Sequence, residues 1–135
     1  AECRHNLLYW RAGEYAGIGP GAHGRLNLDT GWRATATARR PESWLMRVEA
    51  TGQGLVTDDP LTRIERGDEF LVMGLRLAEG IDPHRFALLA GHELDPARVA
   101  VLKAEGFVEA MPDGRLRVTR AGFPVLDAIV ADLAA

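Results

Sequence analysis

The sequence is poor in the residues on which several common classes of protein depend. Its 135 residues include one cysteine, Cys3, which excludes an internal disulfide and a metal site built from several cysteines. No apolar run approaches the roughly 18–20 residues that cross a bilayer, and the chain does not open with a signal-peptide pattern. We therefore expect a soluble, cytoplasmic chain with no membrane span.

Neither sign of charge dominates the chain. Sixteen lysine and arginine residues stand against nineteen aspartate and glutamate residues, which gives a net charge of −3. A protein that binds mainly through nucleic-acid phosphates or an anionic membrane needs a clear excess of positive charge. We therefore do not expect nucleic acid as the main partner.

What the chain does contain is divided between two regions. All three tryptophans and both tyrosines occur in the first 44 residues, and all four phenylalanines come after residue 69. Residues 1–60 hold seven basic and seven acidic groups, whereas residues 61–135 hold nine and twelve. Residues 52–54 and 58–60 have the glycine, aspartate and proline content of a linker. These differences predict two domains, residues 1–59 and residues 60–135.

The second region has strong helix signals. Thr62 and Glu65 have the spacing of a capping box, which predicts a helix from there to about Glu79. Asp-Pro pairs at residues 82–83 and 95–96 each indicate an N-cap followed by proline in the first turn. They predict two further helices.

The rest of this region has the pattern of a hairpin and a final helix. Apolar segments at residues 107–110 and 116–118 flank Asp113-Gly114, a turn pair typical of β-hairpins. Thr119 is a candidate helix cap, but Pro124 falls inside the expected first turns and should delay the helix. The order helix, helix, helix, hairpin, helix is that of a winged-helix module.

A winged-helix module has two functional interpretations. In a DNA-binding protein, residues 96–105 would be the recognition helix, but its only cations are Arg98 and Lys103. Affinity for DNA rises with the number of phosphates that are neutralised. The same fold also serves as a structural or docking module. One hypothesis is therefore a winged-helix module that docks a protein partner or nucleic acid, and the acidic balance favours protein.

The first region opens with a cluster of polar-tipped side chains. His5 could ligate a metal ion or haem iron, Asn6 could orient it, and Tyr9 and Trp10 could stack on a flat ligand. The alternative is the end of a strand, with His5 only hydrogen-bonded and Trp10 in a core. Spacing alone favours that alternative.

A glycine-rich segment follows. Residues 19–24 satisfy the pattern G-x-G-x-x-G, but a dinucleotide-binding motif must open a helix. Here the alternating residues 25–28 predict a strand, and Pro20 removes an amide that a phosphate would use. Serial glycines instead indicate a backbone that something approaches closely. A second strand over residues 32–37 and a helix from Pro41 complete the region.

These residues together carry a resemblance to a known family. Residues 3–11, Cys-Arg-His-Asn-Leu-Leu-Tyr-Trp-Arg, and residues 15–24, Tyr-Ala-Gly-Ile-Gly-Pro-Gly-Ala-His-Gly, closely resemble the oxygen-independent coproporphyrinogen III oxidase-like radical SAM proteins, the HemN/HemW family. Within that family they look most like the haem chaperone branch. The similarity continues through residues 68–77 and 114–119.

The resemblance implies a fold and a set of ligands. It implies an α+β chain in which short strands from the end of a radical SAM barrel precede a helical, winged-helix-like C-terminal domain. His5, Asn6, Tyr9 and Trp10 would form the motif associated with haem binding. A second set would line the S-adenosylmethionine side of the barrel, namely Gly19, Gly21, Ala22 and His23.

The resemblance also implies what lies outside this chain. Members of the family hold a 4Fe-4S cluster through a C-x-x-x-C-x-x-C motif, which a chain with one cysteine cannot supply. We therefore expect the C-terminal part of a longer protein, with no catalysis of its own. Its expected partners are haem or another tetrapyrrole, the missing barrel, and a second copy paired at the exposed strand edge. The residues leave open whether the parent protein is an oxidase or a chaperone.

Overall fold

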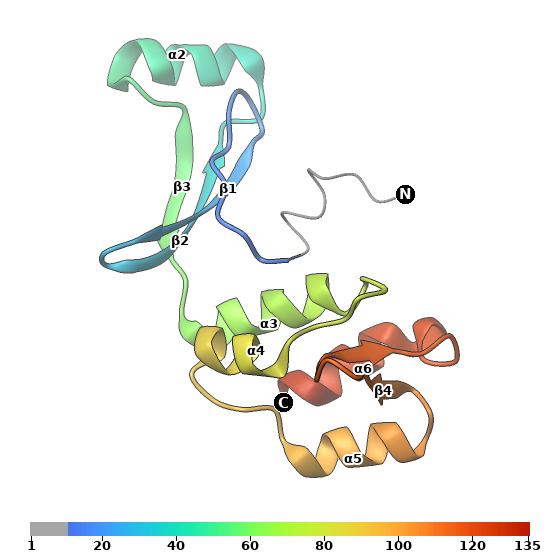
Figure 1. Cartoon of the computed structure of the whole chain (residues 1–135). Helices are drawn as coiled ribbons and strands as arrows, with labels where there is room; N and C mark the ends of the chain where they lie inside the picture. The colour runs from blue at the N-terminus through green and yellow to red at the C-terminus, as the bar shows by residue number, and fades with distance from the viewer. Residues whose placement is uncertain (1–10) are drawn as a thin grey trace. The chain divides into compact units, whose positions relative to one another are not determined.

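The computed structural model describes residues 11–135, which form two compact units (Figure 1). One unit is Gly13–Thr62, and the other is Arg63–Ala135 together with Arg11 and Ala12. The first unit is mainly a β-sheet, and the second is mainly helical with a small hairpin. The α+β class predicted from the sequence is confirmed.

The first unit is a three-stranded antiparallel sheet. Its strands are β1 (His23–Leu28), β2 (Gly31–Thr37) and β3 (Leu55–Pro60), in that spatial order. The helix α2 (Pro41–Thr51) connects β2 to β3. The first two strands and the helix are where the sequence predicted them. Strands of a β/α barrel run parallel, so the pairing within this sheet is not itself that of such a barrel.

The strand β3 replaces the second half of the predicted linker. Asp58, Asp59 and Pro60 are poor strand formers, but β3 is an edge strand, where proline is tolerated because its missing N–H can face solvent. The Arg33 Nε atom of β2 lies 2.6 Å from Asp58 Oδ1, a cross-strand ion pair that offsets the weak propensity. The linker prediction for these residues was therefore wrong.

The helical unit follows the predicted order. Its elements are α3 (Arg63–Gly74), α4 (Pro83–Ala90), α5 (Pro96–Ala104), β4 (Val108–Ala110), β5 (Leu116–Val118), η1 (Phe123–Val125) and α6 (Leu126–Ala134). The carboxylate of Asp82 accepts the His84 N–H and that of Asp95 accepts the Ala97 N–H, both at 2.9 Å, so the two predicted N-caps are confirmed. The late start of the last α-helix, after a short 3-10 turn that contains Pro124, is confirmed as well.

The helix α3 is shorter than the sequence predicted. It ends at Gly74, and a series of turns leads to Gly80, which has a φ of 69°. Ile81 then exchanges two backbone hydrogen bonds of 2.8 Å with Leu116. On α3, Ile64 is 61% exposed while Arg66 is only 2% exposed. Residues 75–81 are therefore a loop fastened to the hairpin.

The hydrophobic core of the helical unit joins its four α-helices and its hairpin. Its fully buried side chains are Leu71, Leu75, Leu77, Ile81, Phe86 and Ile129. Burying a side chain of this size contributes about 1.5–3 kcal/mol to folding. Gly67 of α3 allows the close approach of α4, because a Cβ atom there would lie 2.5 Å from the Ala90 Cβ. In the part of the chain that the structure describes, no helix is long and apolar enough to cross a membrane.

Candidate functional site

The residues that follow the His5–Trp10 segment are anchored in the helical unit. Ala12 is 3% exposed and adopts a left-handed backbone conformation with a φ of 56°, which is uncommon for a residue with a Cβ. Its carbonyl oxygen accepts a hydrogen bond from the buried Arg66 guanidinium. A second, longer bond of 3.4 Å comes from Arg85 Nη2. Ala12, two positions after the motif, is therefore held mainly by Arg66 of α3.

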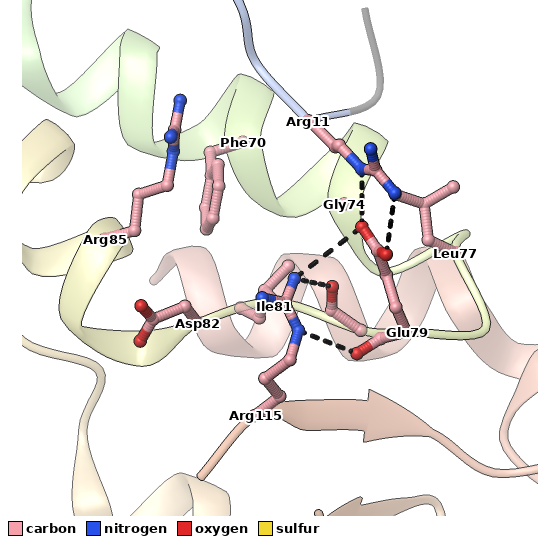
Figure 2. Close-up of a pocket in the computed structure, with 10 residues that line it drawn as sticks. Arg11, Phe70, Gly74, Leu77, Glu79, Ile81, Asp82, Arg85 and Arg115 are labelled. Atoms are coloured by element: carbon pink, nitrogen blue, oxygen red, sulfur yellow. Dashed lines mark hydrogen bonds and ion pairs between the residues drawn. The ribbon is translucent and has the colours of Figure 1, made fainter. Parts of the chain in front are cut away.

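Arg11 provides a second attachment, to Glu79 (Figure 2). Its Nε and Nη2 atoms donate to the two carboxylate oxygens of Glu79 at 2.7 and 2.9 Å, the paired geometry that suits a guanidinium and a carboxylate. Arg115 approaches from the hairpin, donating at 3.0 Å to the backbone oxygens of both Glu79 and Gly80. Its Nη2 also lies 3.7 Å from Glu79 Oε1. Glu79 thus connects Arg11 to Arg115 of the hairpin.

The two arginines change the acidity of Glu79. The hydrogen bond from Arg11 is the main reason that the pKa of Glu79 lies below its ordinary value, and the charges of Arg11 and Arg115 act in the same direction. Partial burial acts in the opposite direction, by raising the pKa, and the arginines together outweigh it. Glu79 is therefore ionised at neutral pH, and its charge is balanced inside the site.

We expect Glu79→Gln to lower the stability of the helical unit at neutral pH by up to about 1 kcal/mol, the usual range for a partly exposed ion pair. A carboxylate whose pKa is lowered by folding adds stability above its unfolded-state pKa, about 4.3. That contribution is lost as the pH falls through the lower, folded-state pKa. The difference in melting temperature between the wild-type and variant chains should thus be constant from pH 6 to 8 and vanish in acid. A difference that persists at pH 2 would contradict this account.

The predicted haem motif lies outside the described residues. His5, Asn6, Tyr9 and Trp10 belong to residues 1–10, so no position is assigned to them, and their role stays a prediction. What the structure adds is their attachment, because Trp10 is bonded directly to Arg11. The first residue after the motif is therefore the one that pairs with Glu79.

The glycines of the glycine-rich segment are required by the fold of this unit. A Cβ at Gly24 would lie 2.4 Å from Thr35 Oγ1, and one at Gly17 would lie 2.8 Å from the His23 carbonyl oxygen. The close approach predicted from these glycines therefore comes from the chain itself. Gly19 and Gly21 have φ values of 85° and 66°, as a turn requires.

The predicted cofactor-side residues lie in the turn that leads into β1 and at its first residue, His23. The Gly21 N–H donates to the Ala38 carbonyl oxygen and the Ala22 N–H donates to Thr37 Oγ1, each at 2.8 Å. The Gly19 carbonyl oxygen accepts from the same hydroxyl at 2.6 Å. These backbone groups are already used within the unit, so a ligand here would meet the half-buried Ala22 and the exposed His23 side chain.

Three residues of the site, Arg66, Glu79 and Arg85, were not predicted from the sequence. Arg66 had a usable signal, because it lies four residues before Phe70 and seven before Met73, on the apolar face of α3. An arginine on such a face implies a buried partner. Glu79 and Arg85 had no such signal, since their partners Arg11 and Ala12 lie more than 60 positions away in the chain.

Other candidate chemistry is not assembled in the structure. Within residues 11–135, no three histidine, cysteine, aspartate or glutamate side chains come together as a metal site would need. His84 is exposed, and His92 packs edge-on against Phe86 with ring centroids 5.5 Å apart. The single cysteine does not fit a 4Fe-4S cluster, which needs several thiolates.

Comparisons with known proteins agree with the resemblance found in the sequence. Residues 61–125 match the model of the HemN C-terminal domain family. A zebrafish (Danio rerio) protein, the mitochondrial radical S-adenosyl methionine domain-containing protein 1, is 32% identical over 140 residues, 96% of this chain and 31% of that protein. The heme chaperone HemW of Mycobacterium tuberculosis is 31% identical over 132 residues, 98% of this chain and 31% of that protein.

A solved structure shows the same fold. It is that of coproporphyrinogen III oxidase (HemN) from Escherichia coli, a radical SAM enzyme. The two structures match with a TM-score of 0.61 and 16% sequence identity, and the match covers 91% of this chain and 29% of the enzyme chain. Nearly the whole chain aligns with the zebrafish and Mycobacterium tuberculosis relatives, but it spans only about a third of their length. It therefore belongs to the HemN/HemW family of radical S-adenosylmethionine proteins, and residues 61–125 are its HemN C-terminal domain.

Proposed function

We propose that this chain is the haem-binding part of a radical SAM protein of the haem chaperone type. The observation that carries the proposal is the anchoring of Arg11 and Ala12, the two residues that follow the His5–Trp10 segment, to the HemN C-terminal domain. A binding motif gains from such attachment, because a ligand group held in place loses less conformational entropy on binding. The heme chaperone relative that matches 98% of the chain supports the same proposal.

In this proposal each motif residue has a separate role. His5 ligates the haem iron through an imidazole nitrogen, and Asn6 orients the imidazole. Tyr9 and Trp10 stack on the face of the macrocycle. In this role haem is the cargo that the protein binds and passes on. The chain therefore needs no catalytic group for it.

The remaining cofactors belong to the parent protein. There, a 4Fe-4S cluster and S-adenosylmethionine would be held mainly by residues beyond this chain, and the Gly19–His23 turn would contribute the Ala22 and His23 side chains. We propose that residues 13–62 adjoin the end of the radical SAM barrel and that residues 63–135 act as a winged-helix-like domain. A cytoplasmic location and self-association at a free strand edge are parts of the same proposal. The alternative, a docking module for protein or nucleic acid, is not favoured by the family match.

The proposal is tested by titrating haem into the 135-residue chain. We expect a shifted Soret band in the wild type and a loss of affinity of about tenfold or more in His5→Ala, because an iron ligand is removed. His84→Ala is the matched control, since His84 is an exposed histidine of the helical unit. No Soret shift in the wild type, or the same spectrum in the His5 variant, would rule out His5 as the ligand.

A further inference from the structure

The helical unit contains a cleft beside the anchored segment. It has a volume of about 340 Å³ and lies between the loop after α3, the start of α4 and the hairpin. Its floor is apolar, formed by Phe70, Leu77 and Ile81, which are 1–3% exposed. Three arginines, Arg11, Arg85 and Arg115, are among the other residues that line it (Figure 2). An apolar floor under several guanidinium groups suits an anionic arm on an apolar ligand.

The carboxylates in this cleft are already engaged. Glu79 is paired with Arg11 and lies near Arg115, and Asp82 caps α4 by accepting the His84 N–H. Arg85 differs from the other two arginines, because no carboxylate of residues 11–135 lies within ion-pair distance of it. Its only hydrogen bond within those residues is the 3.4 Å contact with the Ala12 carbonyl oxygen, at the weak end of the range. Its guanidinium can therefore donate hydrogen bonds to an anionic ligand.

The cleft lies next to the proposed haem motif. Arg11 lines the cleft and directly follows Trp10 in the sequence, so the cleft adjoins the residue that comes after the proposed haem motif. Haem carries two propionate side chains, and a guanidinium binds a carboxylate in paired, charge-assisted hydrogen bonds. The cleft is too small for the whole macrocycle, but it is ample for a propionate arm.

We propose that Arg85, which lines the cleft together with Arg11 and Arg115, binds a propionate carboxylate of the tetrapyrrole held by His5–Trp10. This inference rests on the proposed haem binding and adds a specificity determinant to it. It explains why a unit with an excess of acidic residues places three arginines around one apolar hollow. The recognised group is the carboxylate, so ligands that lack it should lose this contact.

The experiment compares haem with its dimethyl ester, in which both carboxylates are blocked. The two ligands are titrated into the wild type, Arg85→Gln and the matched control Arg120→Gln, which removes an exposed arginine outside the cleft. We expect Arg85→Gln to weaken haem binding by about tenfold, as for loss of a charge-assisted hydrogen bond, and to leave ester binding unchanged. Iron-free protoporphyrin, followed by fluorescence, should show the same loss, because its carboxylates remain and iron ligation is removed from the measurement.

The outcomes separate this inference from the function on which it rests. Unchanged haem affinity in Arg85→Gln, or equal weakening of haem and its ester, would overturn the role of Arg85 while a His5-dependent Soret shift upheld haem binding. Absence of any haem binding by the wild type would overturn both. Thermal melts of the Arg85 and Arg120 variants should match the wild type, since both side chains are exposed.

Discussion

Replacing Gly80 with alanine should lower the free energy of unfolding of the helical unit by about 3 kcal/mol or more. Gly80 has a φ of 69°, where a residue with a Cβ costs about 1–2 kcal/mol. The added Cβ would also lie 2.2 Å from the Leu116 carbonyl oxygen and 2.7 Å from its carbon, both backbone atoms that no rotamer change can move. Relief of this clash must break the Ile81–Leu116 pairing.

The matched control for Gly80→Ala is Gly106→Ala. Gly106 has a φ of 80°, yet a Cβ there would meet nothing within 4 Å. The control therefore measures left-handed strain alone, and we expect it to cost about 1–2 kcal/mol. Chemical denaturation of both variants, with equal denaturant slopes, gives the comparison. Equal losses in the two variants would show that contact between Gly80 and the hairpin contributes nothing.

The position of Gly80 also connects stability to the site. Glu79 precedes it, and the backbone oxygens of both residues accept hydrogen bonds from Arg115. A shift of this loop would move the Glu79 carboxylate away from Arg11. We therefore expect Gly80→Ala to loosen the N-terminal segment as well as the domain, whereas Gly106→Ala should leave the Arg11–Glu79 pair intact.

The helical unit was largely predictable because its signals are local. The two Asp-Pro caps, the Asp113-Gly114 turn and the delay at Pro124 each act within a few residues, so a single sequence is enough to place them. The wrong predictions concern elements whose limits are set by contacts between residues far apart in the sequence. The strand β3 exists because β2 pairs with it, and the helix α3 ends at Gly74 in a loop that the hairpin holds.

Of the candidate site, only the motif of adjacent residues could be predicted from the sequence. His5, Asn6, Tyr9 and Trp10 are adjacent in the chain, so their pattern is visible without a fold. The residues that hold the segment are separated from it by long stretches of chain, 54 positions between Ala12 and Arg66 and 68 between Arg11 and Glu79. No local pattern encodes such pairings, and only the packed helical unit brings them together.

Arg66→Met should be the second strongly destabilising substitution, with an expected loss of about 1–3 kcal/mol. Arg66 is 2% exposed, and its guanidinium donates to the Ala12 carbonyl oxygen while Nη1 lies 3.2 Å from Glu69 Oε2. Methionine fills a similar volume, so the packing term changes little. Among residues 11–135, the buried Ala12 carbonyl oxygen then keeps only the 3.4 Å bond from Arg85, and this under-satisfied group contributes to the loss.

Two further variants identify the cause of that loss. Glu69→Gln removes the ion pair but leaves the bond to Ala12, and because the Glu69 side chain is 31% exposed we expect it to cost less than about 1 kcal/mol. Arg76→Met removes an exposed arginine just beyond α3 and should be neutral. Equal effects of the Arg66 and Glu69 variants in thermal or denaturant unfolding would assign the stability to the ion pair instead.

The same variant tests whether anchoring matters for ligand binding. Arg66→Met changes none of the proposed haem contacts, but it releases Ala12, the left-handed residue two positions after Trp10. A released segment must be ordered again on binding, which costs about 1–2 kcal/mol for each residue fixed. At a temperature where the variant remains folded, we therefore expect about tenfold weaker haem binding with an unchanged Soret position. A variant that is folded and binds haem as tightly as the wild type would show that the helical unit does not organise the motif.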